Sequence, residues 1–138
     1  MMKELIAKSE LLLARCETVT LASVSEEGFP RICVMSPNRR EGVRRVYLST
    51  GTDSVKTKHF RKNSRASLCF TEGNDSVTLL GHVTVLEDAA IKQELWEDWY
   101  ISHFPGGPED PGYCILRFDA FEATIWIDRI FKTVTIEE

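Results

Sequence analysis

The sequence lacks a long apolar segment and a secretory signal. None of its apolar runs approaches the roughly 20 residues that a membrane-spanning helix needs. Residues 1–8 alternate charged and apolar side chains and contain no small-residue cleavage site. We therefore expect a cytoplasmic protein that makes no membrane contact. The composition, 43% apolar and 28% charged over 138 residues, predicts a single globular domain spanning residues 1–138.

Patterns typical of metal sites and disulfide frameworks are also missing. The four cysteines, Cys16, Cys33, Cys69 and Cys114, lie at least 17 residues apart, so none has the spacing of a zinc clip. The three histidines form no metal-binding motif. We expect four reduced cysteines that pack as small apolar side chains, and no metal site.

Charge is distributed unevenly, although the formal net charge is only −4. Residues 31–65 hold ten Lys and Arg side chains and two carboxylates, a local charge of +8, whereas the rest of the chain carries −12. A cationic stretch in an acidic protein favours a small anionic ligand, because the acidic surroundings repel a long polyanion. We therefore expect no nucleic-acid partner. The alternative is a solvated face whose cations pair with carboxylates elsewhere in the chain.

Apolar periodicity and turn residues predict three helices and six or seven strands. The helices are expected over 2–16, from the turn at 50–54 to about residue 62, and over 89–103, with Thr52 or Asp53 capping the second. The strands are expected over 18–24, 30–35, 45–49, 66–70, 77–86, 113–118 and 124–136, with a kink or bulge near residues 119–120. Residues 37–42 and 104–112 are expected to be loops.

Short connections between the strands indicate a mainly antiparallel sheet, because a parallel crossover needs a dozen or more residues. A small α+β barrel with flanking helices is the economical packing of these elements. Three aromatic residues at helical spacing, Trp96, Trp99 and Tyr100, are expected to pack in the core or against a partner subunit.

The stretch from Tyr47 to Lys56 combines the features of a phosphate site. A strand ends in Ser49, Thr50 and a glycine, and a helix begins at once with Ser54 and Lys56 in its first turn. Free backbone N–H groups and the positive end of the helix dipole lie at such a junction. The spacing differs from the P-loop of nucleotide triphosphatases. The stretch therefore indicates a phosphate-bearing small molecule, and the alternative is a capped helix with an exposed lysine.

Several short motifs follow one another in a specific order over roughly residues 4–127. They are Gly28-Phe29-Pro30, the runs 46–50 and 54–56, Asn63, Gly81, Leu95-Trp96, the loop 104–113 and Trp126. Their order resembles the flavin-binding split-barrel family of pyridoxamine-phosphate oxidase and its short general-stress-protein relatives. The resemblance implies an α+β fold, a mainly antiparallel split β-barrel of six to seven strands with flanking helices. It also implies a homodimer that holds FMN in two clefts between the subunits.

The resemblance further implies which residues contact FMN. Lys56 and Ser54 would hold the phosphate with help from Ser49 and Thr50, and the backbone of residues 31–35 would run along the isoalloxazine ring. Another polar contact would come from Ser76, and Trp126 of the partner chain would close the cleft. The implied cofactor-binding set is Arg31, Ile32, Cys33, Val34, Met35, Ser49, Thr50, Ser54, Val55, Lys56, Ser76 and Trp126.

Two departures from the family pattern concern the ligands. Val55 stands where the family often has an arginine, which removes one bidentate phosphate contact, and Arg31 and Arg61 are candidates to compensate. The full oxidase carries an Arg-x-His pair after its late tryptophan that helps to hold the substrate, whereas Ile127-Asp128-Arg129-Ile130 follows Trp126 here. This difference argues against true pyridoxamine-phosphate oxidation. Haem and a deazaflavin stay open as alternative ligands.

Two functions fit these observations. The first is an FMN-dependent oxidoreductase with an unknown small-molecule substrate, in which the flavin supplies the electron chemistry. The second is a flavin-binding protein of the stress response that has no turnover. No residue type or spacing identifies a catalytic acid or base, so the catalytic residues stay unassigned.

Overall fold

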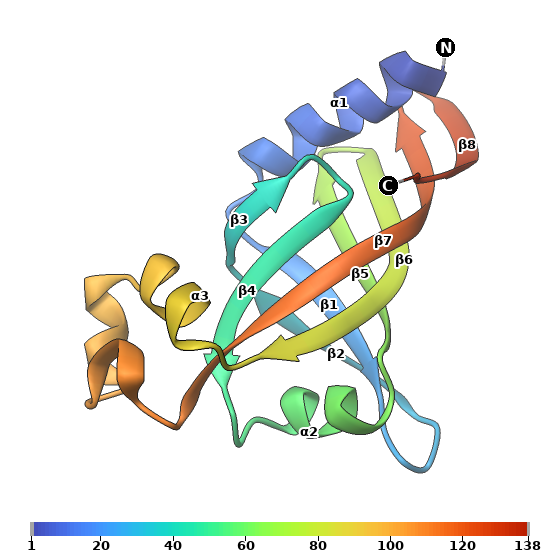
Figure 1. The fold of residues 1–138 in the computed structure, drawn as a ribbon. Coiled ribbons are helices and arrows are strands. Elements are labelled where there is room, and N and C mark those ends of the chain that lie inside the picture. The colour runs from blue at the N-terminus through green and yellow to red at the C-terminus, as the bar shows by residue number, and fades with distance from the viewer. Residues whose placement is uncertain (1, 138) are drawn as a thin grey trace.

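The computed structural model describes residues 2–137, which form one curled sheet with helices at its ends (Figure 1). The strands are β1 (Val19–Val24), β2 (Pro30–Met35), β3 (Pro37–Glu41), β4 (Arg45–Gly51), β5 (Arg65–Glu72), β6 (Asp75–Leu86), β7 (Tyr113–Ile127) and β8 (Ile130–Thr135). The helices are α1 (Met2–Arg15), α2 (Val55–Lys62) and α3 (Ala89–Glu94), and short 3₁₀ helices cover Asp98–Ser102 and Gly107–Glu109. None of these helices is long and apolar enough to cross a membrane.

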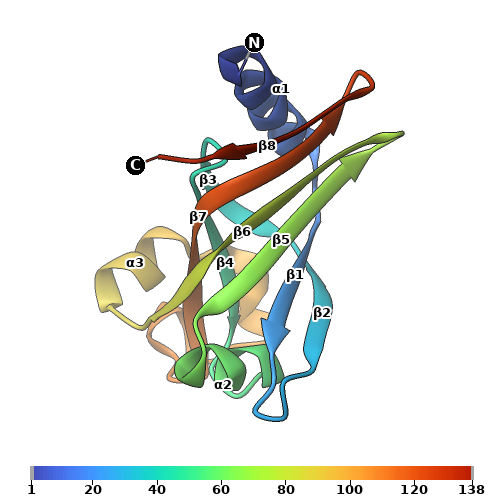
Figure 2. The same ribbon diagram turned by 90° about the vertical axis from the view of Figure 1, so that its right-hand side faces the viewer.

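The strands pair in the order β2-β1-β5-β6-β7-β4-β3, and β8 adds to β7. Every one of these pairings is antiparallel. The sheet curls into a half-barrel, which Figure 2 shows from the side. The predicted α+β split barrel is therefore confirmed, although the sheet has eight strands rather than six or seven.

The additional strand is β3, which occupies residues expected to be a loop. Its polar residues carry no strand signal, but they pair with β4 along the edge of the sheet. The Arg39 guanidinium lies over the Tyr47 ring, 4.6 Å from the ring centre, and forms an ion pair with Glu94 at 3.2 Å. These contacts with distant residues stabilise a strand that local propensity does not predict.

The strand β7 changes its core-facing positions midway along its length. Core-facing side chains occupy even-numbered positions up to Ala120 and odd-numbered positions from Ala123 onward. Phe121 is the extra residue of a β-bulge, because the register with β6 shifts at this point. The bulge predicted near residues 119–120 is confirmed, but the strand continues through it as a single element to Ile127. The strand expected over 124–136 is instead divided by a turn at Asp128 and Arg129, which have positive φ angles.

Two hydrophobic cores lie on opposite faces of the sheet. The main core fills the inside of the curl, and Leu5 and Leu12 of α1 cover one end of it. Phe60 of α2 belongs to the same core at the opposite end, as the positions of the two helices in Figure 1 show. The second core lies beneath α3 and consists of Tyr47, Leu95, Tyr100, Tyr113 and Ile115.

The helix expected over 89–103 ends early, since α3 has only six residues. Glu97 is extended, and a 3₁₀ helix follows it. This break lets Tyr100 turn beneath the sheet, where it is buried and its hydroxyl donates to the Glu97 carboxylate at 3.0 Å. Trp96 packs edge-on against Tyr100, with ring centres 5.4 Å apart, as a core residue should. Trp99 is 60% exposed instead.

The loop 104–112 is held together by Asp110. Its carboxylate accepts the backbone N–H of Gly106 at 2.9 Å and that of Gly112 at 2.8 Å. Its carbonyl oxygen accepts a hydrogen bond from Lys92 Nζ at 3.0 Å. The Gly106 and Gly112 donors hold the pKa of the Asp110 carboxyl below its usual range.

The approach of β6 to the bulge of β7 requires a glycine at position 81. A Cβ added to Gly81 would overlap the carbonyl oxygen of Asp119. We expect Gly81→Ala to lower the free energy of unfolding by about 1–3 kcal/mol, because the backbone has to shift to relieve the overlap. The control is Gly51→Ala, whose added Cβ would meet its nearest atom at 3.6 Å. Urea denaturation gives the free energy of unfolding of both variants. Equal values would show that β6 and β7 do not approach each other closely at Gly81.

The lowered pKa of Asp110 predicts a pH-dependent contribution to stability. A carboxyl whose pKa is lower in the folded state stabilises the protein at neutral pH and loses this effect as the pH falls through the folded pKa. We expect Asp110→Asn to melt below the wild type at pH 7, because the amide offers one acceptor oxygen instead of two. The difference should shrink as the pH falls through the lowered pKa of the wild-type carboxyl, where that carboxyl becomes protonated. A difference in melting temperature that does not change with pH would show that the ionised Asp110 carboxylate does not stabilise the fold.

Candidate functional site

The turn between β4 and α2 presents the start of a helix at one end of the sheet. Ser54 caps α2, since its Oγ accepts the backbone N–H of Thr57 at 3.3 Å. Thr52, one of the two alternative caps expected, instead donates its hydroxyl to the Pro111 carbonyl at 3.1 Å. The cap prediction was therefore wrong by one or two residues, because a contact with the loop engages Thr52.

The first turn of α2 leaves donors available for an anion. Because Ser54 Oγ also bonds Thr57 Oγ1 at 2.7 Å, the Ser54 hydroxyl is already engaged in the turn. The backbone N–H groups of Val55 and Lys56 lie ahead of the first intrahelical hydrogen bonds, where the helix dipole is positive. Lys56 forms no ion pair within residues 2–137.

The cationic segment 31–65 divides into paired and unpaired residues. Those with ion pairs are Arg39, Arg44, Arg45, Arg61 and Lys62. Arg40 donates to the Cys16 carbonyl oxygen at 2.7 Å. Those without an ion pair in the described chain are Arg31, Lys56, Lys58 and Arg65. The solvated, ion-paired alternative therefore accounts for only part of the segment.

Arg31 lies at the same end of the sheet as α2. It pairs in register with Ser23 of β1, and the Ser23 hydroxyl contacts His59 Nδ1 on α2 at 2.8 Å. Arg31 is exposed. The backbone of Arg31 is therefore linked to α2 through its register partner Ser23.

The side chains of β2 alternate between the two faces of the sheet. Cys33 and Met35 pack against the main core, whereas Ile32 and Val34 are 68% and 70% exposed. β2 pairs only with β1 among the described strands, so one edge of its backbone carries unpaired N–H and C=O groups. The segment therefore offers a ligand a backbone edge with apolar side chains beside it.

Ser49 and Thr50 do not face the same way, because consecutive residues of a strand point to opposite faces. Thr50 is buried beside its register partner Cys114. Ser49 Oγ is buried on the other face without a hydrogen-bond partner in the described structure. Both residues line a cavity of about 360 Å³, with Tyr100 and Phe104 among its other walls.

Ser76 and Trp126 are brought together, but far from α2. They are register partners on β6 and β7. Trp126 is 39% exposed, and its ring centre lies 5.7 Å from that of Phe131. They lie near the end of the sheet that α1 covers, whereas Lys56 lies on the helix at the opposite end (Figure 1). One chain therefore separates the expected cofactor residues into two groups.

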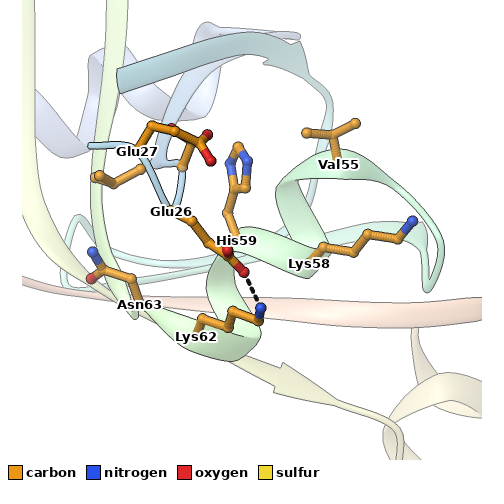
Figure 3. Close-up of a pocket in the computed structure, with 9 residues that line it drawn as sticks. Glu26, Glu27, Val55, Lys58, His59, Lys62 and Asn63 are labelled. Atoms are coloured by element: carbon orange, nitrogen blue, oxygen red, sulfur yellow. Dashed lines mark hydrogen bonds and ion pairs between the residues drawn. The ribbon is translucent and has the colours of Figure 1, made fainter. Parts of the chain in front are cut away.

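A cavity of about 570 Å³ separates α2 from the β1–β2 turn. Figure 3 shows Val55, His59 and Lys62 of α2 across from Glu26 and Glu27 of the turn. An ion pair joins Glu26 to Lys62, which lowers the pKa of the Glu26 carboxyl. Val55 is the one residue of the expected cofactor set that lines this cavity. Sequence reasoning missed the two glutamates, because nothing local indicates that the turn faces α2.

The cysteines and the metal-ligating residue types support no redox or metal centre among the described residues. All four cysteines are free thiols, as expected. Burial raises the pKa of the Cys114 thiol to about 11, so it is protonated at neutral pH. No group of three or more metal-ligating side chains converges within residues 2–137.

Comparison with known proteins agrees with this architecture. A Clostridium acetobutylicum protein related to general stress protein 26 of B. subtilis (pyridoxinephosphate oxidase family) is 27% identical, with a TM-score of 0.85 over 97% of this chain and 96% of that one. General stress protein 26 of Bacillus anthracis is 19% identical, with a TM-score of 0.79 over 96% and 99% of the two chains.

A pyridoxamine 5'-phosphate oxidase-related, FMN binding protein of Nostoc punctiforme is 15% identical. It shares the fold, with a TM-score of 0.68 over 99% of this chain and 95% of that one. No curated protein sequence matches the chain. Residues 5–127 match the family model described as pyridoxamine 5'-phosphate oxidase. Since this match covers most of the sequence, the chain belongs to the pyridoxamine 5'-phosphate oxidase family.

Proposed function

We propose that residues 1–138 form a single FMN-binding domain of a homodimeric flavin-dependent oxidoreductase. The observation that carries the proposal is the start of α2, where an unpaired Lys56 lies at a helix N-terminus on the same end of the sheet as Arg31 and the open edge of β2. Backbone N–H groups, a helix dipole and an ammonium together favour a phosphate. The family match agrees with a flavin as the group that carries this phosphate.

The phosphate of FMN would be bound by Lys56, Arg31 and the first amides of α2. Arg31 is the better candidate to replace the arginine that the family often has at position 55, because Arg61 already forms an ion pair with Glu87 at 3.3 Å. Ser54 would act by holding the helix start in place, since its hydroxyl caps the first turn. Bidentate guanidinium contacts to phosphate are among the stronger hydrogen bonds in proteins.

The isoalloxazine ring would lie along β2. Its polar edge suits the unpaired backbone groups of the edge strand, and its apolar plane suits the exposed side chains of Ile32 and Val34. When bound, FMN would supply the electron-transfer chemistry, and the protein residues would bind and orient it. No side chain in this region has a geometry that assigns it as a catalytic acid or base.

A homodimer would unite the two groups of cofactor residues. Several large apolar side chains are exposed on β2, β7 and β8, among them Ile32, Val34, Trp126 and Phe131. Exposed apolar side chains of this size often mark a protein interface. A two-fold partner packed against these strands would bring Ser76 and Trp126 of one chain toward Lys56 of the other.

The substrate would differ from that of the full oxidase. Asp128 and Arg129, which follow Trp126, have positive φ angles of 52° and 66° and form the turn between β7 and β8. Asp128 also forms an ion pair with Lys8 of α1 at 2.7 Å. These residues therefore complete a hairpin and its contact with α1, where the full oxidase has a substrate-holding pair.

The absorption spectrum of the purified protein, recorded before and after addition of FMN, tests the proposal together with the sedimentation mass. Flavin bands on a dimer would support it. Reduction of the bound flavin by a nicotinamide donor then separates an oxidoreductase from a flavin-binding protein without turnover. A colourless protein that takes up no FMN would overturn the proposal.

Replacing Lys56 tests the phosphate contact. We expect Lys56→Ala to weaken FMN binding by about 1–3 kcal/mol, because a charge-assisted hydrogen bond is lost. Lys58→Ala is the matched control, since it removes an unpaired lysine from another side of the same helix. Quenching of FMN fluorescence on titration measures both affinities. Unchanged affinity of Lys56→Ala would exclude this lysine from the phosphate site.

Replacing Trp126 tests the interface. We expect Trp126→Ala to weaken the dimer by about 2 kcal/mol or more, the scale of an aromatic interface anchor. Trp99→Ala is the control, because Trp99 is also exposed but lies near α3, away from the proposed interface. Sedimentation over a range of protein concentrations gives both dissociation constants. Equal values for the two variants would remove Trp126 from the interface.

A further inference from the structure

The cavity of about 360 Å³ beside the end of β4 has walls made mainly of aromatic rings. Trp99 and Tyr100 come from the 3₁₀ helix that follows α3, and His103 and Phe104 come directly after it. Figures 1 and 2 place α3 across the molecule from β2, whose exposed side chains belong to the proposed interface. The cavity therefore lies apart from the surface that the proposed partner would cover.

The aromatic rings of this cavity stand at steep angles to one another. The Trp99 ring lies 4.7 Å from the Tyr100 ring, centre to centre, with an angle of 77° between the planes. It lies 6.0 Å from the His103 ring at 82°. Tyr100 is buried, whereas Trp99 is exposed, so one ring forms the floor and the other a side wall. Rings arranged in this way present several faces to one ligand, and the face of an aromatic ring is its negative part.

The charge around the cavity favours a cation. Residues 86–112 hold seven carboxylates and one lysine, a local charge of −6, which is opposite to that of residues 31–65. The hydroxyl of Tyr100 donates to the Glu97 carboxylate at 3.0 Å, which places a negative charge at the floor. Lys92 is engaged elsewhere, since its Nζ donates to the Asp110 carbonyl. The described lining contains no Lys, Arg, Asp or Glu.

We propose that this cavity binds an organic cation whose nitrogen is quaternary. Such a cation is attracted to the faces of Trp, Tyr and Phe rings. It also has no N–H group, whereas a primary ammonium would need an acceptor for each of its N–H groups. A trimethylammonium group and the pyridinium ring of an oxidised nicotinamide share this chemistry. The volume is near the lower end of small-molecule pockets, roughly 300 Å³, so one headgroup would fill the cavity.

The inference deepens the proposed function and rests on it in one respect. Ser49 and Thr50 line the cavity, and Lys56 follows them at the start of α2. A molecule that carries the cation would therefore bind beside the proposed flavin site, as its substrate or product. Ser49 Oγ is buried without a hydrogen-bond partner in the described structure, so it would pair with a hydroxyl or amide group next to the quaternary nitrogen.

Ligand-detected ¹H NMR of the purified protein, with saturating FMN and without it, tests the site. The probes are 1-methylnicotinamide and choline, and we expect the N-methyl signal of at least one of them to broaden saturably. The probe that binds identifies which source of the quaternary nitrogen the cavity accepts. The neutral counterparts, nicotinamide and 3,3-dimethylbutan-1-ol, should bind at least about tenfold more weakly because they lack the charge.

Substitution of Trp99 tests the aromatic wall. We expect Trp99→Ala to weaken binding of the cation about fivefold or more, and Trp99→Phe to retain most of the affinity because a ring face remains. Trp99 is exposed, so its removal leaves the hydrophobic cores intact. The control is Leu11→Ala, which removes an exposed apolar side chain of α1 outside the cavity and should bind the cation as the wild type does.

Three outcomes overturn the proposal: neither cation binds saturably, the neutral counterparts bind equally well, or Trp99→Ala binds as the wild type does. FMN affinity should be the same in Trp99→Ala and the wild type, so cation binding and flavin binding can fail separately. Binding of the cation by a protein that takes up no FMN would support the site and overturn its role beside the flavin.

Discussion

The fold depends on the backbone hydrogen bonding of β7. This strand pairs with β4 along its first part, with β6 along most of its length and with β8 along its last part. Its first residues are buried on both faces, because the main core lies on one side and Tyr113 and Ile115 join the second core on the other. The bulge at Phe121 changes which positions face the core while both neighbouring ladders continue.

The same sheet geometry determines how the candidate site is divided. Alternation along a strand sends Ser49 and Thr50 to opposite faces, and it separates Ile32 from Cys33 in the same way. The length of β6 and β7 carries Trp126 to the end of the sheet opposite α2. A ligand that contacted both groups of residues would have to lie between two chains. Sheet geometry therefore links the proposed cofactor site to the proposed dimer.

Local signals predicted most elements correctly and failed where distant contacts decide the conformation. Alternating apolar residues were sufficient for β1 and β6, and Asn63 ends α2 as expected, with its N–H bonded to the His59 carbonyl. The strand β3 was missed because its stability comes from pairing with β4 and from the contact of Arg39 with Tyr47. The helix was predicted to continue past the end of α3 to residue 103. It stops early because burial of Tyr100 outweighs the helical spacing of its aromatic neighbours.

The sequence by itself determined the antiparallel α+β class, the helix start with Lys56 after β4, the bulge near Ala120 and the family. These features depend on short-range periodicity, turn residues and the order of motifs, all of which can be read along the chain. Only the tertiary structure decided that Ser54 is used in capping, that Arg61 pairs with Glu87, and that His82 lies against Phe121. The reason is physical: pairing and burial depend on which strands become neighbours, and that arrangement joins residues distant in sequence.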